Sequence, residues 1–375
     1  MSKINTLAFY LPQFHPIPEN NQWWGPGFTE WTNVSRSLPR FKGHHQPQIP
    51  ADLGFYDLRL SDTRFAQAEM AKRYGVTGFC YYHYWFNSKT LLDFPLQEKL
   101  RDIEDDFPFC ICWANENWTR AWDGLDRQIL IRQQYSNSDD IAHFRHILPI
   151  ISDKRYIKIN GMPMVLIYRP DIMPNFSNFI KLWKGMAASS GLPGLYICAV
   201  KTGFYKGSDE DLIRAGANSI VDFQPNAQYF KFSSDFKSNL QGLLKNFIPD
   251  SLYQTIKINI KISKKISYKK LSLYLSNRQW PIDYRIFPCV FPSWDNSARR
   301  KSATIIQNDY PDDYGNWLAS AIDAVSNYHE SERFIFINAW NEWAEGCHLE
   351  PDLKMGHSFL EQTQLQISRH NNSQC

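Results

Sequence analysis

The sequence lacks most of the patterns that mark whole classes of protein. No stretch approaches the ~18 consecutive apolar residues of a membrane span. Residues 1–14 contain no basic region followed by a long apolar run, so we expect no signal peptide. No glycine-rich phosphate-binding loop follows a predicted strand. The formal net charge of +3 is too small to indicate nucleic acid as a partner, and no nucleic-acid-binding motif accompanies it.

Cysteine is sparse, and its distribution argues against disulfides and metal sites. The seven cysteines are odd in number, and most lie inside apolar runs, where a thiol is usually a small core residue. No group of Cys and His has zinc-ligand spacing, and Cys110 and Cys112 lack the spacing of a redox pair. We therefore predict no metal, no cofactor and a reducing, cytoplasmic location.

Aromatic residues, by contrast, are abundant, with 13 Trp, 19 Tyr and 25 Phe. Such an excess serves packing, and it also provides rings that can lie against the faces of sugars. The 375 residues suit one large domain or two ordinary ones. Because the sequence contains no internal repeat and no low-complexity linker, we predict a single domain over 1–375.

Eight short apolar runs recur along the chain, separated by helical patterns. Near-continuous runs of this kind indicate strands buried on both faces, as in a parallel sheet. The alternation predicts a (β/α)8 TIM barrel, which takes about 250 residues. A doubly wound sheet is the alternative, but no GxGxxG follows the first run. The runs are 6–15, 76–85, 107–116, 164–170, 195–200, 219–225, 286–294 and 334–340, and the helical patterns are 61–74, 139–151, 176–191, 208–216, 314–328 and 357–370.

The remaining length falls mainly after the first and sixth runs, in 16–58 and 226–285. Both segments would rise over the catalytic face of a barrel. We expect 226–285 to be a lid or side wall of the same domain. Alternating isoleucines over 256–262 predict an amphipathic strand there. The lysines between 257 and 270 form a solvated face in the interpretation that we favour, and a peripheral contact with an acidic glycan or phospholipid surface is the alternative.

Polar and aromatic side chains gather where the apolar runs end, which is where barrel enzymes carry their catalytic groups. The set is aromatic, amide and carboxylate, with almost no lysine. It suits sugar rings, their hydroxyls and acid–base work at a glycosidic bond. The binding residues that we predict are Tyr10, Tyr82, Trp113, Asn115, Glu116, Trp118, Tyr168, Gln224, Trp294 and Asn341. For some of them simpler interpretations remain open: Trp113 and Trp118 as packing residues, and Glu116 as the ion-pair partner of Arg120.

Two glutamates, Glu342 and Glu345, follow the last apolar run within NAWNEWAEG, residues 338–346. Their i, i+3 spacing places both carboxylates on one side of a helical turn, facing one pocket. Buried carboxylates cost desolvation energy unless they are paired, protonated or used in chemistry. We predict that they are catalytic. The alternative is that one pairs with an arginine and the other faces solvent.

Four long segments resemble the WbsX group, which is named for glycosyltransferases of bacterial surface-polysaccharide gene clusters. The resemblance runs from Tyr10 to Asp352. Through its NEWxEG element the group is similar to glycoside hydrolase family 99, the endo-α-mannosidase and endo-α-mannanase family. The segments are YLPQFHPIPENNQWWGPGFTEWTNV, GFCYYHYWF, WANENWTRAWDG and NAWNEWAEGCHLEPD.

The resemblance to family 99 implies roles for both glutamates. Glu342 would take the proton from a sugar 2-hydroxyl, and Glu345 would protonate the leaving oxygen. Water would then open the resulting 1,2-anhydro sugar, with net retention. A conventional retaining barrel glycosidase fits less well, because the fourth and seventh runs end in Tyr168-Arg169-Pro170-Asp171 and Pro292-Ser293-Trp294-Asp295, without glutamate. The mannose-binding residues of family 99 have no residue-by-residue match here.

Three functions stay open, each with an oligosaccharide or polysaccharide as partner. The first is a retaining endo-glycosidase or transglycosylase that acts on a bacterial surface polysaccharide or its precursor. The second is a glycosyltransferase of O-antigen or capsular polysaccharide biosynthesis, against which stands the lack of a DxD-like signature. The third is a non-catalytic glycan-binding barrel, and the intact Glu342 and Glu345 argue against it.

Overall fold

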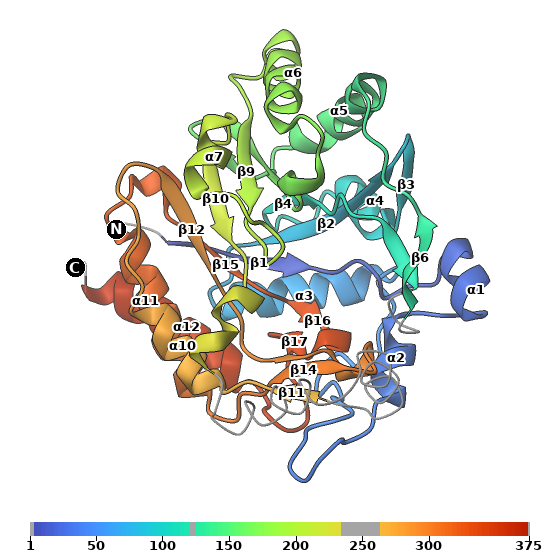
Figure 1. The fold of residues 1–375 in the computed structure, drawn as a ribbon, viewed down its shortest axis with the longest axis vertical. Coiled ribbons are helices and arrows are strands. Elements are labelled where there is room, and N and C mark those ends of the chain that lie inside the picture. The colour runs from blue at the N-terminus through green and yellow to red at the C-terminus, as the bar shows by residue number, and fades with distance from the viewer. Residues whose placement is uncertain (1–3, 121–124, 234–262, 374–375) are drawn as a thin grey trace, which may run out of the picture.

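The computed structural model describes residues 4–120, 125–233 and 263–373, and its centre is a closed barrel of eight parallel strands (Figure 1). The hydrogen-bonded order is β1-β15-β12-β10-β9-β8-β4-β2, and β2 pairs with β1 to close the ring. The predicted (β/α)8 barrel is therefore confirmed. The barrel strands are β1 (Asn5–Tyr10), β2 (Gly78–Phe86), β4 (Phe109–Trp113), β8 (Met162–Ile167), β9 (Tyr196–Val200), β10 (Ser219–Asp222), β12 (Arg285–Val290) and β15 (Phe334–Ile337).

The strands are shorter than most of the apolar runs that predicted them. Six of the eight runs continue past the carboxyl end of their strand, as 107–116 does past Trp113. The extra residues leave the sheet and turn into the loops at the mouth of the barrel. They mix apolar and aromatic residues with polar ones, and many of both kinds are buried.

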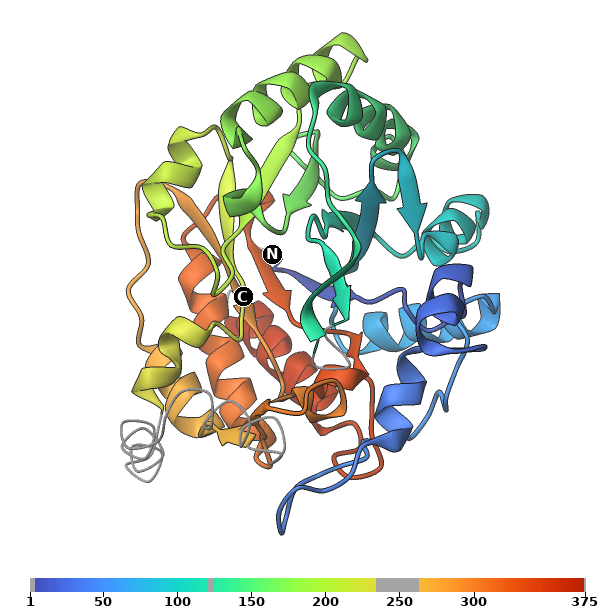
Figure 2. The same ribbon diagram turned by 45° about the vertical axis from the view of Figure 1, so that its right-hand side comes forward.

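Helices surround the barrel on its outer side (Figures 1 and 2). Local caps fix several starts: the Ser136 hydroxyl accepts from the Asp139 N–H, and Ser208 and Asp211 form a reciprocal capping box. The helices near predicted positions are α3 (Ser61–Arg73), α5 (Asn137–Ile151), α6 (Phe176–Ser189), α7 (Asp209–Arg214), α11 (Pro311–Ser326) and α12 (Ser358–Ser373). Those without a sequence prediction are α1 (Pro18–Trp24), α2 (Glu30–Arg36), α4 (Phe94–Arg101) and α10 (Tyr268–Ser276).

Short strands and 3-10 turns lie at both ends of the barrel. The short strands are β3 (Lys89–Leu91), β5 (Trp118–Arg120), β6 (Leu125–Ile131), β7 (Lys158–Ile159), β11 (Ser263–Lys265), β13 (Trp294–Asp295), β14 (Ala303–Ile306), β16 (Asn341–Glu342) and β17 (Cys347–His348). The 3-10 turns are η2 (Pro170–Ile172), η3 (Ala227–Phe232), η4 (Asn296–Ala298), η5 (Glu330–Glu332) and η6 (Trp343–Glu345).

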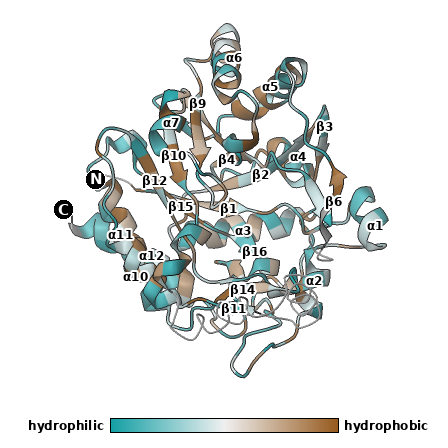
Figure 3. Ribbon diagram, in the orientation of Figure 1, coloured by the Kyte–Doolittle hydropathy of each residue, from teal (hydrophilic) through white to brown (hydrophobic). Residues whose placement is uncertain are grey.

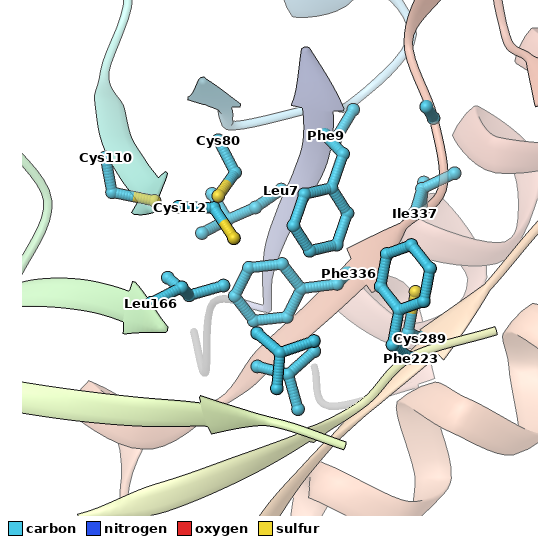
Figure 4. Packing of buried hydrophobic residues seen from close by; sticks show 14 of the residues in the cluster. Leu7, Phe9, Cys80, Cys110, Cys112, Leu166, Phe223, Cys289, Phe336 and Ile337 are labelled. Carbon is cyan, nitrogen blue, oxygen red and sulfur yellow. The ribbon is translucent and has the colours of Figure 1, made fainter. Parts of the chain in front are cut away.

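The barrel interior is filled by apolar side chains. Figure 4 shows Leu7, Phe9, Cys112 and Phe336 close together, and the Phe9 and Phe336 ring centroids are 5.5 Å apart. Colouring by hydropathy shows brown on the barrel strands and teal on much of the outer helices (Figure 3). The six cysteines of the described residues are buried and form no disulfide. Dense packing at this depth makes the barrel a rigid support for its loops.

The described ends of the 226–285 segment join the rest of the molecule. Strand β11 pairs in parallel with β14, which follows β12 in the chain, and α10 packs on α11. The isoleucines of 256–262 and the lysines before residue 263 lie outside the described residues, so the predicted strand and membrane contact stay predictions. Within the described residues, no helix combines the length and the apolar character that crossing a bilayer requires.

Candidate functional site

A pocket of about 290 Å³ lies at the carboxyl ends of the barrel strands. Its walls come from the carboxyl-terminal part of β2 and from loops that follow β1, β4, β8, β10, β12 and β15, so residues far apart in the sequence meet there. Seven of the twelve predicted site residues line it. They are Tyr82, Glu116, Trp118, Tyr168, Trp294, Glu342 and Glu345.

Two predicted aromatic residues lie outside the pocket lining. Side chains alternate along a strand, so Phe9 faces the barrel interior and the next residue, Tyr10, faces outward. There the Tyr10 hydroxyl donates to Gln67 Oε1 on α3 at 2.7 Å. Trp113 is equally buried and packs against His143 and Trp183, with ring centroids at 4.6 and 6.2 Å. The packing interpretation that the sequence left open for Trp113 describes its observed position.

Three of the predicted residues with amide side chains are also buried outside the pocket lining, where they form hydrogen bonds with the backbone of loops. Asn115 accepts from the Arg169 N–H at 2.7 Å and donates to the Arg169 carbonyl at 2.9 Å. Asn341 bonds in the same two-way manner to the backbone of Leu11, at 2.7 and 3.0 Å. Gln224 accepts from the Asn226 N–H at 2.9 Å. Their amides are occupied by these bonds, so they shape the pocket walls from behind.

The two glutamates of the last loop lie on one wall of the pocket, joined by an arginine. Arg299, which follows η4, approaches Glu342 Oε1 at 2.5 Å through Nη2 and Glu345 Oε1 at 2.9 Å through Nη1. Arginine pairing, which the sequence offered as an alternative for one glutamate, therefore occurs for both. Neither carboxylate is turned away from the pocket, because both line it together with Arg299.

A third carboxylate, Glu30, belongs to the same cluster. It opens α2, is 1% exposed, and places Oε2 3.1 Å from Arg299 Nη2. One guanidinium thus contacts three carboxylates. Neither Glu30 nor Arg299 was among the predicted residues. Glu30 lies within the WWGPGFTEW segment, where a lone acid among aromatic rings was the one available signal.

Burial dominates the proton balance of this cluster. It raises the pKa of Glu342 to about 8, Arg299 opposes the shift, and the charges of Glu345 and Glu30 add to it. Burial also raises the pKa of Glu30, again against Arg299. Burial alone would lower the pKa of Arg299, but the three carboxylates hold it well above its ordinary value. The cluster therefore retains protons that isolated carboxyls would lose.

Glu116 also lines the pocket, and its ion-pair partner differs from the one that the sequence suggested. Its carboxylate accepts from Arg169 Nη1 at 2.5 Å, and Arg169 also bonds Asp171 through Nε at 2.8 Å. Arg120 instead donates to the Trp23 carbonyl at 3.1 Å and lies over the Trp24 ring. The alternative pairing of Glu116 with Arg120 is therefore wrong.

An aromatic wall closes one side of the pocket. Trp23 and Trp24 of α1 are partly buried and line it, and the Trp23 and Trp118 ring centroids are 5.9 Å apart. Trp118 also meets the Tyr84 ring edge-on at 5.2 Å. Figure 1 shows α1 and β6, the partner strand of β5, at the same edge of the molecule. Of these three tryptophans, the sequence predicts only Trp118 as a binding residue.

A buried acid, Glu350, holds in place the loop that carries Glu342 and Glu345. Glu350 accepts hydrogen bonds from Trp343 Nε1 at 2.6 Å, Tyr56 Oη at 2.7 Å and Gln67 Nε2 at 2.6 Å. Burial raises the pKa of Glu350 to about 7, while these donors oppose the shift. Because Trp343 lies between Glu342 and Glu345 in the chain, this network fixes the turn that presents both. The described residues contain no group of three or more His, Cys, Asp or Glu arranged to hold a metal ion.

Solved structures share the fold. The chain aligns with the family 99 endo-α-mannosidase of Bacteroides thetaiotaomicron at a TM-score of 0.58 and 12% identity, over 99% of this chain and 98% of that one. A structure described as a glycoside hydrolase-like protein gives 0.57 at 11% identity, over 98% and 94%. At such low identity the likeness shows the fold alone.

A barrel whose mouth carries paired carboxylates and an aromatic wall has the features typical of the class of carbohydrate-active enzymes. The chain belongs to the WbsX family, since the family model described as "Glycosyltransferase WbsX" matches residues 6–363. The predicted family is thereby confirmed. Proteins named "Uncharacterized protein WxcX" from two strains of Xanthomonas campestris pv. campestris are 39% identical over 366 residues, which is 97% of this chain and 49% of theirs. The chain thus spans about half the length of these curated relatives.

Proposed function

We propose that the chain is a retaining endo-glycosidase or transglycosylase that acts on a bacterial surface polysaccharide or its precursor. The observation that carries the proposal is the placement of Glu342 and Glu345 on one pocket wall, bridged by Arg299. The aromatic wall of Trp23, Trp24 and Trp118 offers ring faces for sugars. The named activity of the family 99 neighbour reaches this chain only as an analogy of fold.

In the proposed reaction the first step uses the substrate's own oxygen as nucleophile. Glu342 takes the proton of the sugar 2-hydroxyl, and that oxygen attacks the anomeric carbon. The glycosidic bond breaks as the leaving oxygen takes the proton of Glu345. Water then gives a proton to Glu345 and attacks the anomeric carbon, while the 2-oxygen leaves and recovers its proton from Glu342. A sugar hydroxyl in place of water would give transglycosylation.

The exposure of the two side chains agrees with these roles. Glu345 is 22% exposed, so a leaving oxygen can reach it, whereas Glu342 is 7% exposed and lies deeper. The raised pKa of Glu342 means that the free protein holds a proton there around neutral pH. The proposed route needs that proton on Glu345 once the sugar is bound. We therefore expect the pH dependence of kcat to differ from that of kcat/KM.

The glycosyltransferase alternative finds less support in the pocket, although the family carries that name. A nucleoside diphosphate needs free cationic groups near its phosphates. Here Arg299 is engaged by three carboxylates, and Glu116, Glu342 and Glu345 all face the pocket. Among the described residues that line it, none is a lysine, and the arginines are Arg299 and Arg300. Three carboxyl groups therefore share the lining with these two arginines, which favours a neutral glycan over a sugar nucleotide.

The proposal is tested by incubating the purified protein with a panel of bacterial surface polysaccharides and α-mannans in ¹⁸O-labelled water. We expect shortened oligosaccharides that carry the label at a new reducing end, and Glu345→Gln and Glu342→Gln are the matched inactive controls. Cleavage should survive EDTA. Consumption of a sugar nucleotide that depends on Mg²⁺ or Mn²⁺ would indicate the transferase, and glycan binding without turnover would indicate a binding barrel.

A further inference from the structure

The burial and the contacts of Glu30 indicate that this residue does more than support the fold. Its side chain is inaccessible, and its Oε1 has no hydrogen-bond partner among the described protein groups. A buried polar atom without a partner is unusual and carries a cost. The other oxygen, Oε2, is 3.1 Å from Arg299 Nη2 and 3.3 Å from Arg299 Nε. Among the described residues, Arg299 is therefore the hydrogen-bond and ion-pair partner of the Glu30 side chain.

The Arg299 guanidinium is divided between Glu30 and the catalytic pair. Its Nη2 serves both Glu30 and Glu342, at 3.1 and 2.5 Å, and its Nη1 serves Glu345 at 2.9 Å. Two carboxylates that share one N–H group compete for the same positive charge. The charge of Glu30 therefore weakens the hold of Arg299 on an ionised Glu342.

We propose that Glu30 is a positioning residue that fixes Arg299 and governs how the proton is divided between Glu342 and Glu345. It does not touch the reacting sugar and acts through the guanidinium. Its catalytic consequence rests on the proposed function, but the division of the proton is a property of the free protein. A purely structural Glu30 would hold α2 against the catalytic loop without changing the titration of Glu342.

Other ionisable groups also face the cluster. Burial raises the pKa of Tyr82 and of Cys347, which both lie near Glu342, so these two groups stay neutral over the relevant range. The charges that act on Glu30 are Arg299 and Glu345, and Tyr84 of β2 faces Glu30, Glu342 and Arg299. Burial raises the pKa of Tyr84, so its phenol stays neutral over the relevant range. Glu30 therefore affects Glu342 through the shared guanidinium and through the direct effect of its own charge.

The test is a pH titration of the full-length protein with ¹³C-carboxyl-labelled glutamate, followed by NMR. The Glu342 resonance is assigned from its loss in Glu342→Gln. In Glu30→Gln the positive charge of Arg299 is less compensated, which favours the ionised form of Glu342. The Glu342 midpoint should then fall by about one pH unit or more. Glu30→Asp keeps the charge, so its midpoint should stay near that of the wild type.

The matched control is Glu332→Gln. Glu332 lies just before β15 and forms an ion pair with Arg285, so its loss also removes a carboxylate. This variant should leave the Glu342 midpoint unchanged. An unchanged midpoint in Glu30→Gln, or equal shifts in Glu30→Gln and Glu30→Asp, would overturn the role. If Glu30→Gln fails to fold, the wild-type spectra provide the test. A Glu30 carboxyl that stays protonated throughout the titration of Glu342 would refute charge sharing. No substrate is needed, so failure here is distinct from failure of the proposed function.

Discussion

In the proposed reaction, catalysis depends on which of the two carboxyl groups, Glu342 or Glu345, carries the proton. If Glu345 is the general acid, Glu345→Gln should suppress cleavage by about 10²–10⁴-fold when the leaving group needs a proton. The loss should shrink for activated aryl leaving groups, which depart without one. The measurement is kcat/KM for a series of aryl glycosides with graded leaving-group pKa.

Glu342 should behave differently, because in the proposed reaction it activates the nucleophile, which every substrate needs whatever its leaving group. Glu342→Gln should be impaired for every member of the same series, and a 2-deoxy glycoside should resist the wild-type enzyme. A covalent sugar trapped on Glu342 would contradict this expectation, since it would make the residue an ordinary nucleophile.

The buried acid form of Glu342 also has a consequence for stability. Its pKa lies at about 8 in the folded protein, above the ordinary value of 4.5. The folded state therefore binds more protons than the unfolded state between these values, so this group lowers the free energy of unfolding as pH rises from about 5 to about 8. Glu342→Gln should lose less stability over that interval in urea unfolding. Equal pH slopes for variant and wild type would contradict the assigned protonation.

The sequence could predict some site residues and not others for identifiable reasons. The i, i+3 spacing of Glu342 and Glu345 is local, and the prediction that both face one pocket matches the lining. Glu30 and Arg299 are 269 residues apart, so no local pattern reveals their contact. Tyr10 was placed in the pocket because an apolar run does not show which side of a strand faces inward, and Phe9 holds the inward position.

At the scale of elements, the aromatic wall is formed by two elements that lie outside the barrel strands. Helix α1 supplies Trp23 and Trp24, and the β5–β6 hairpin supplies Trp118. Arg120 of the hairpin donates to the Trp23 carbonyl at 3.1 Å, which ties the two elements together. The wall is therefore one unit built from separate loops.

Removing a ring from this wall should weaken glycan binding without unfolding the protein. Trp118→Ala is expected to reduce affinity for a cleavable oligosaccharide about tenfold, because one stacking face is lost. Isothermal titration with the inactive Glu345→Gln background measures the change. The control is Phe65→Ala, which removes a ring that is 54% exposed on α3, outside the pocket lining. Equal effects of the two changes would refute the wall as a binding surface.

Elements differ in how strongly the sequence marks them. Each barrel strand is buried over nearly its whole length and therefore reads as an apolar run, which is why all eight could be predicted. Helices α1, α2 and α4 have seven or eight residues, too few for an apolar period to emerge, and none has a side-chain cap at its start. Helix α7 is shorter still, but Ser208 and the acids that follow it mark its start.

At the scale of the whole molecule, the 226–285 segment should not fold alone. Strand β11 takes its partner from β14, and α10 packs on α11, both outside the segment. A fragment of residues 226–285 is expected to show no cooperative thermal unfolding by circular dichroism. A stable fragment would mean that the chain has a second domain.

Closure of the barrel through β1 has a consequence for how the protein is made. Strand β1 begins at Asn5, and its partner β15 ends at Ile337, so most of the chain is synthesised between them. Until β15 leaves the ribosome, one edge of β1 has no partner, and exposed edges invite aggregation. Glu342 and Glu345 emerge later still. Late in translation the nascent chain therefore contains most of the barrel but not yet the two glutamates. Protection of the open edge of β1 by chaperones would matter most in this last part of translation.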